Sequence, residues 1–212
     1  MRRRLAAALA AGLACGPGSV RALDRQIDDV GITEALVVAS RSEAARDAFH
    51  GRYVITIGDP THDRVEVIGE FRRVVLTAAE RLPFDRRWSV PQAREALAPY
   101  RGLVSIVAWI RFPPQNLLVS VPPYGVVVYP DGRALRDGRR TVLRPSSQSI
   151  TALYPAGGGL ALTGPPGGAM GGIRLEALFP ADALPLSGVC TVGLVLGEVV
   201  EREVDVGLGG VR

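Results

Sequence analysis

Residues 103–112, Leu-Val-Ser-Ile-Val-Ala-Trp-Ile-Arg-Phe, decide the fold. Every even-numbered position in this stretch is apolar, while Ser105 and Arg111 fall between them. A period of two is typical of a β-strand with one face on a core. Val107 and Trp109 share the second face, which is therefore expected to be partly apolar as well. The chain changes character here, from mostly helical patterns before residue 102 to almost only strand patterns after it.

Strand-like runs continue to the end of the chain. They lie at residues 117–121, 125–129, 141–143, 149–154, 172–178, 189–196 and 199–206. Turn-forming sequences such as Pro130-Asp131-Gly132 and Gly197-Glu198 separate some of them. Short strands joined by tight turns indicate an antiparallel β-sandwich or an open barrel over residues 103–212.

Upstream, apolar residues recur at helical spacing in three places, near residues 32–49, 69–82 and 90–98. Ser89 and Gln92 form a capping-box pattern at the start of the third. Between the first two, residues 53–67 alternate like a β-hairpin. We therefore predict an α+β fold with about three helices packed on the β-sandwich or open barrel. The helix-rich part, 23–102, and the β part, 103–212, are expected to form one compact unit.

The first 22 residues have the order of a secretory signal peptide. A basic start is followed by an apolar run from Leu5 to Ala14 and by the helix breaker Gly16-Pro17-Gly18. Small side chains before position 23 predict cleavage after Ala22. The apolar run is shorter than the about 20 residues that span a bilayer, and no later segment reaches that length without charges. We expect a bacterial envelope protein, periplasmic or extracellular, without a transmembrane helix in the mature chain.

Three export routes stay open. Cys15 follows Gly12-Leu13-Ala14, which resembles a lipobox and would make the chain a lipoprotein. The consecutive arginines at the start also look like a twin-arginine (Tat) signal, which exports folded proteins. Ordinary (Sec) secretion is the third route.

The leader also carries the net charge. The chain has 25 basic and 21 acidic residues, and four of the basic ones lie in residues 1–22, which contain no acid. The remaining chain is therefore neutral, which argues against a nucleic-acid partner. No residue is Lys, and this excludes chemistry that needs one, such as a phosphate-binding P-loop. Cys190 is the only Cys outside the leader, and its apolar neighbours predict a buried side chain.

Catalytic candidates are few. Asp59, His62 and Asp63 lie within five residues and are weak candidates for a metal site or an oriented base, although a Pro-containing turn explains them equally well. No Ser has the sharp Gly-x-Ser-x-Gly context of a nucleophile. The glycine-rich residues 155–172 precede a strand pattern rather than a helix, so we expect a flexible loop and no nucleotide cradle. No cofactor is predicted.

Two aromatic residues are weak candidates for partner binding. Trp88 follows Arg86-Arg87, and Tyr124 follows a double proline. Exposed aromatics beside Arg suit protein contacts, although packing against the core is the commoner role.

The sequence favours a non-catalytic binding or structural domain with an envelope protein or surface component as its partner. The first alternative is a small periplasmic hydrolase or metal-dependent enzyme that uses the Asp59, His62 and Asp63 region. The second is an envelope scaffold anchored by a lipid on Cys15.

Overall fold

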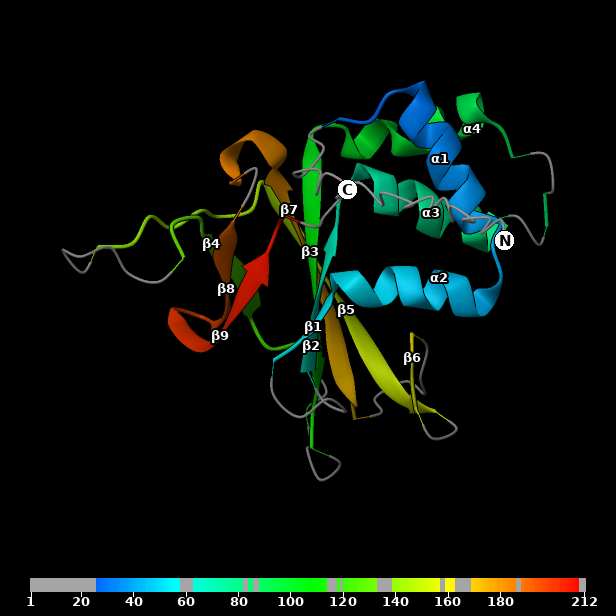
Figure 1. The fold of residues 1–212 in the computed structure, drawn as a ribbon. Coiled ribbons are helices and arrows are strands. Elements are labelled where there is room, and N and C mark those ends of the chain that lie inside the picture. The colour runs from blue at the N-terminus through cyan, green and yellow to red at the C-terminus, as the bar shows by residue number, and fades with distance from the viewer. Residues whose placement is uncertain are drawn as a thin grey trace, which may run out of the picture.

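In the part of the chain that the structure describes, the fold is α+β, as predicted, with four α-helices and two antiparallel sheets (Figure 1). The computed structural model describes residues 26–57, 63–81, 84–85, 88–113, 118, 120–132, 139–156, 159–162, 169–185 and 188–209. The leader and its cleavage site lie outside these residues. In the described part, no helix has the length and apolar character needed to cross a bilayer.

The helices are α1 (Asp29–Ala39), α2 (Glu43–His50), α3 (Glu70–Arg81) and α4 (Val90–Leu97). The predictions for the last two are confirmed to within a residue at each end, and Ser89 N donates to Gln92 Oε1 as its capping box requires. The single helix expected over residues 32–49 is wrong, because it is two helices that break at residues 40–42. Arg46 Nη1 stabilises the break by donating to the carbonyls of Ala39 and Arg41.

The larger sheet has six strands in the order β1-β2-β3-β7-β5-β6 and curls into a half-barrel. The strands are β1 (Val54–Thr56), β2 (Asp63–Ile68), β3 (Leu103–Arg111), β7 (Gly172–Pro180), β5 (Ser147–Ala156) and β6 (Gly159–Ala161). The strands of the expected hairpin, β1 and β2, pair with each other and join the sheet beside β3. The sheet is thus assembled from both halves of the chain.

The smaller sheet has the order β4 (Tyr124–Tyr129), β8 (Val189–Leu196) and β9 (Val199–Gly207). Two expected strands differ from the prediction. Leu143 forms only an isolated bridge to Val128, and Leu118 is not in a strand. The glycine-rich segment is also more regular than expected, because it contributes the end of β5, all of β6 and the first residue of β7.

Two cores hold the layers together, and Phe49 packs against both of them. The first lies between the sheets and contains the even-numbered side chains of β3 together with Val128, Cys190 and Val206. The second lies within the helical layer, where Ile32, Phe71 and Val75 meet the other buried residues of α1, α3 and α4. The apolar stripe of α3 is therefore buried mainly against other helices. In Figure 1 the helices lie on one side of the large sheet and β4, β8 and β9 on the other.

A buried carboxylate ties the helical layer to the sheet. Glu70, at the start of α3, is 1% exposed and accepts hydrogen bonds from Ile27 N, Gly102 N and Arg101 Nη1 at 2.7–3.0 Å. These donors come from the segment before α1 and from the turn before β3. Glu70 thereby joins the start of α3 to the turn that leads into β3.

Candidate functional site

The face of the large sheet that looks toward the helices is polar. Antiparallel register places Glu66, Val107, Glu176 and Ser149 in one row across four strands. The next row contains Arg64, Trp109, Arg174 and Thr151. Because side chains alternate along a strand, both rows project from the same face. This face of the sheet therefore presents an ordered array of charges to the helical layer.

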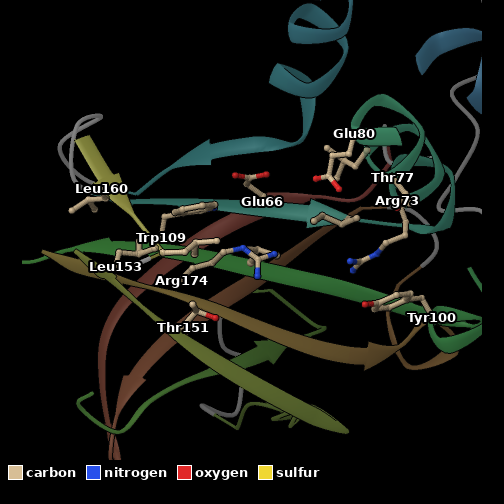
Figure 2. Close-up of a pocket in the computed structure, with 14 residues that line it drawn as sticks. Glu66, Arg73, Thr77, Glu80, Tyr100, Trp109, Thr151, Leu153, Leu160 and Arg174 are labelled. Atoms are coloured by element: carbon tan, nitrogen blue, oxygen red, sulfur yellow. The ribbon is translucent and has the colours of Figure 1, made fainter. Parts of the chain in front are cut away.

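A pocket of about 630 Å3 lies between this face and α3. Figure 2 shows it with its lining side chains. The polar and aromatic lining comes from the two rows, from α3 and from the short helix η2 (Ala98–Tyr100). It comprises Glu66, Arg73, Thr77, Glu80, Tyr100, Trp109, Thr151 and Arg174. The apolar lining comprises Ile68, Leu76, Val107, Leu153, Leu160 and Leu162.

Glu176 binds two arginines at the centre of this array. Its Oε1 accepts from Arg73 Nη2 at 2.8 Å and its Oε2 from Arg174 Nη2 at 2.9 Å. Arg73 also donates to the hydroxyl of Ser105, and its guanidinium lies 3.9 Å from the ring centre of Tyr100. Burial raises the pKa of Glu176, but the bonds and charges of the two arginines outweigh it and hold the pKa below its usual range. Glu176 is therefore a carboxylate that anchors cations.

Glu66 makes a similar pair of contacts on β2, which is separated from the strand of Glu176 by β3. Its Oε2 accepts from Arg72 Nη2 at 2.7 Å, and its Oε1 lies 3.1 Å from Arg64 Nε. The Arg72 side chain is 2% exposed and also donates to the carbonyl of Val67 at 2.8 Å. Desolvation lowers the pKa of Arg72, against the opposing effect of Glu66. Both carboxylates are thus engaged through both of their oxygens.

The other end of the pocket is apolar. Leu153 on β5 lies opposite Gly172 on β7, one row beyond Arg174. Leu160 on β6 covers this row, because a Cβ on Gly172 would lie 3.2 Å from Leu160 Cδ1. In Figure 2, Leu153, Leu160 and Trp109 lie at one side of the pocket and Arg73 and Tyr100 at the other, with Arg174 between them. The pocket therefore has an apolar end and a charged end, which lie at different positions along the strands.

Trp109 contacts two arginines of the charged array. The Arg64 guanidinium lies 4.6 Å from its ring centre, and that of Arg174 lies 5.8 Å away. The indole Nε1 is buried and has no hydrogen-bond partner among the described residues. Trp109 is therefore both a wall of the pocket and its natural spectroscopic reporter.

His50 lies near the charged layer but does not line the pocket. It ends α2, and its ring meets Phe49 edge-on with the centroids 5.2 Å apart. Desolvation and the charge of Arg72 lower its pKa, despite the opposing charges of Glu66 and Asp47. Its Nδ1 is buried without a hydrogen-bond partner in the part of the chain that the structure covers. No carboxylate of the described residues is hydrogen-bonded to this Nδ1, where it would orient the ring as a base.

The candidate metal residues stay untested. Asp59 and His62 lie outside the described residues, and Asp63 is placed only by its backbone, which pairs with Ile110 at the start of β2. No group of three His, Cys, Asp or Glu side chains that could share a metal ion occurs within the described ranges.

The two aromatic candidates lie apart from the pocket. Trp88 is 8% exposed and belongs to the helical core. Tyr124, which is half-buried, stacks on Phe112 with the ring centroids 6.4 Å apart. Both positions agree with the packing interpretation, and a partner-binding role for either residue stays a prediction.

The sequence contains a signal for this site that composition alone does not show. Arg64-Val65-Glu66 and Arg174-Leu175-Glu176 are two Arg-x-Glu patterns, each inside a strand. A spacing of two puts Arg and Glu on one face. That the two faces coincide depends on the strand order β2-β3-β7, which the sequence does not reveal.

Comparison with known proteins gives no relative. The sequence matches no protein-family model, no curated protein and no solved structure.

Proposed function

We propose that this chain is an exported, non-catalytic binding domain and that the pocket between α3 and the large sheet is its ligand site. One observation carries the proposal, namely a pocket of about 630 Å3 that lies between the large sheet and α3. Small-molecule sites of proteins are concave, measure about 300–1,000 Å3 and combine apolar walls with a few placed polar groups. The pocket has this size and this composition.

The lining supports binding rather than catalysis. Glu66 and Glu176 each hold two arginines, and the lowered pKa of Glu176 makes it a poor proton acceptor near neutral pH. Among the described residues, the lining contains no Ser, Cys or His, which are common nucleophiles and bases. Its side chains are therefore suited to holding a ligand in place.

The leader supports an exported location, periplasmic or extracellular. The ligand would then be a component of the cell envelope or its surface, either free or presented by a partner protein. Sec secretion, Tat export and attachment through Cys15 are equally compatible with this role.

Trp109 makes the proposal testable. The chain has only two Trp residues, so the Trp88→Phe variant leaves Trp109 as the only source of indole fluorescence. A small-molecule extract of bacterial envelopes should change its emission, and native mass spectrometry of the unmodified protein should show a stoichiometric bound mass.

The Thr151→Phe variant should block the pocket, because Thr151 lines it from β5 and Phe is much larger than Thr. Thr141→Phe is the matched control, since Thr141 is exposed and does not line the pocket. Binding should disappear in the first variant and persist in the second. A protein that binds nothing, or a Thr151→Phe variant that binds as before, would overturn the proposal.

A further inference from the structure

The charged layer of the pocket points to the chemistry of its ligand. We infer that the ligand is an amphipathic anion, with a carboxylate, phosphate or sulfate head bound by Arg73 and Arg174 and an apolar part that lies toward Leu153 and Leu160. This inference rests on the function proposed above.

Positive charge exceeds negative charge in the layer. Four arginines, at positions 64, 72, 73 and 174, surround the two carboxylates of Glu66 and Glu176. Glu80 also lines the pocket but is exposed and far less desolvated. Even with Glu80 counted, one positive charge is left over. Arg64 is 47% exposed, so water screens much of its charge, but Arg73 and Arg174 are only 14% and 27% exposed. The surplus therefore favours a further anion beside Arg73 and Arg174, which line the pocket.

The arginines have donors available for that anion. Arg73 and Arg174 each bind Glu176 through Nη2, while their Nε and Nη1 atoms make no hydrogen bond with the described residues. A guanidinium has five N–H donors in a planar fork that matches the oxygens of a carboxylate or phosphate. Both side chains also line the pocket, so an oxygen-bearing head group can reach them.

The apolar end fixes the direction of the ligand. Leu153 and Gly172 lie two residues along the strands from Arg174, which is about 7 Å at the usual rise per residue. Leu160 covers this end from β6. An apolar chain attached to a head group at Arg174 would therefore contact leucine side chains along the sheet.

A cationic ligand fits less well. Both carboxylate oxygens of Glu66 and of Glu176 already accept from arginines. Both aromatic rings that line the pocket already hold an arginine, with Arg73 on Tyr100 and Arg64 on Trp109. A cationic ligand would also add to the positive charge that already exceeds the negative charge in this layer.

The experiment compares probes that share one chain and differ in the head group. Octanoate, octyl phosphate, 1-octanol and octyltrimethylammonium are titrated into the unmodified protein by calorimetry, and Trp109 emission in the Trp88→Phe variant locates the binding. We expect both anions to bind at least about ten-fold more tightly than 1-octanol, as charge-assisted hydrogen bonds predict.

Arg174→Gln should remove this about ten-fold preference and leave 1-octanol unchanged. Arg94→Gln is the matched control, because Arg94 pairs with Asp29 on the outer side of the helical layer and is 51% exposed. It should leave every affinity unchanged. Glu176→Gln gives an independent check with the opposite sign, since it frees arginine donors and should tighten the binding of both anions.

The outcomes distinguish a failure of the anion inference from a failure of the proposed binding function. Equal affinity for octanoate and 1-octanol, or tighter binding of octyltrimethylammonium, overturns the anion inference but leaves a ligand-binding pocket. If none of the probes binds while an envelope ligand still binds in a Thr151-dependent way, the inference fails alone. If neither the probes nor the extract binds, the proposed function fails with it.

Discussion

Replacing Glu176 with Gln tests the charged layer through stability. Glu176 binds Arg73 and Arg174 through separate oxygens, and Gln retains only one acceptor oxygen, so one of the two bonds is lost. A hydrogen bond to a charged group contributes about 1.5–3 kcal/mol. The side chains of Arg73 and Arg174 are 14% and 27% exposed, so water partly compensates the loss. We expect Glu176→Gln to lower the free energy of unfolding by about 2 kcal/mol at pH 7.

The effect should depend on pH in a defined direction. The folded-state pKa of Glu176 is lowered, so its carboxylate stabilises the fold above the unfolded-state pKa, and this contribution is lost as pH falls through the folded-state pKa. The stability difference between the unmodified protein and Glu176→Gln should therefore be constant from pH 7 to about 5 and shrink below about pH 4.

Urea unfolding followed by circular dichroism measures this difference. With an m-value of about 2 kcal/mol/M, the midpoint should fall by about 1 M at pH 7. Glu80→Gln is the matched control, because it makes the same change at an exposed site on the pocket rim and should shift stability by less than about 0.5 kcal/mol. Equal effects of the two substitutions at pH 7, or a Glu176→Gln effect that persists unchanged at low pH, would refute the reasoning.

Three further predictions follow from buried groups outside the ion-pair layer. Glu70→Gln should lower the free energy of unfolding by about 2–3 kcal/mol in the same urea assay, because it leaves a buried N–H donor unpaired. A change of less than about 0.5 kcal/mol would contradict the role of Glu70 in joining the helical layer to the sheet. Burial raises the pKa of the Cys190 thiol to about 11, so its labelling by iodoacetamide at pH 8, followed by mass spectrometry of its peptide, should be slow until urea unfolds the protein. Labelling at the same rate in both states would contradict this. Gly172→Ala should destabilise far more than Gly171→Ala in thermal unfolding, because its Cβ would collide with the backbone carbonyl oxygen of Ile110. A Cβ on Gly171 would meet side chains alone, namely the end of Leu160 and the ring of Pro155. Equal losses at both glycines would be evidence against this packing.

The sequence predicts local structure well where one residue pattern controls it. The period of two in residues 103–112 correctly gives β3, and the Ser89 and Gln92 pair correctly gives the start of α4. The pattern fails at residues 40–42, because apolar spacing continues through a turn that depends on Arg46 reaching back to the preceding carbonyls. Side-chain bonds of this kind are not visible in hydrophobic periodicity.

The candidate site is less predictable for a related reason. Glu66 and Glu176 are 110 positions apart, and only the order β2-β3-β7 places them in one row. Each Arg-x-Glu pattern taken alone is typical of a solvated strand face. Strand order depends on the packing of the whole chain. The sequence therefore predicts each Arg-x-Glu strand face but does not predict that the two faces lie in one pocket.

The arrangement of the cores explains why the pocket exists. The sheet buries its apolar face against the smaller sheet, and α1, α3 and α4 bury their apolar faces against one another. Phe49 packs against both cores and contacts Tyr53 of one and Phe71 of the other. Beside this aromatic contact, the two layers meet through Glu70 and through paired charges. Replacing a buried ion pair with apolar side chains is often neutral or stabilising, so stability alone does not account for four arginines and two glutamates at this position. The recognition role proposed above would account for them, since fixed and partly desolvated arginines bind an anion more strongly than arginines in water.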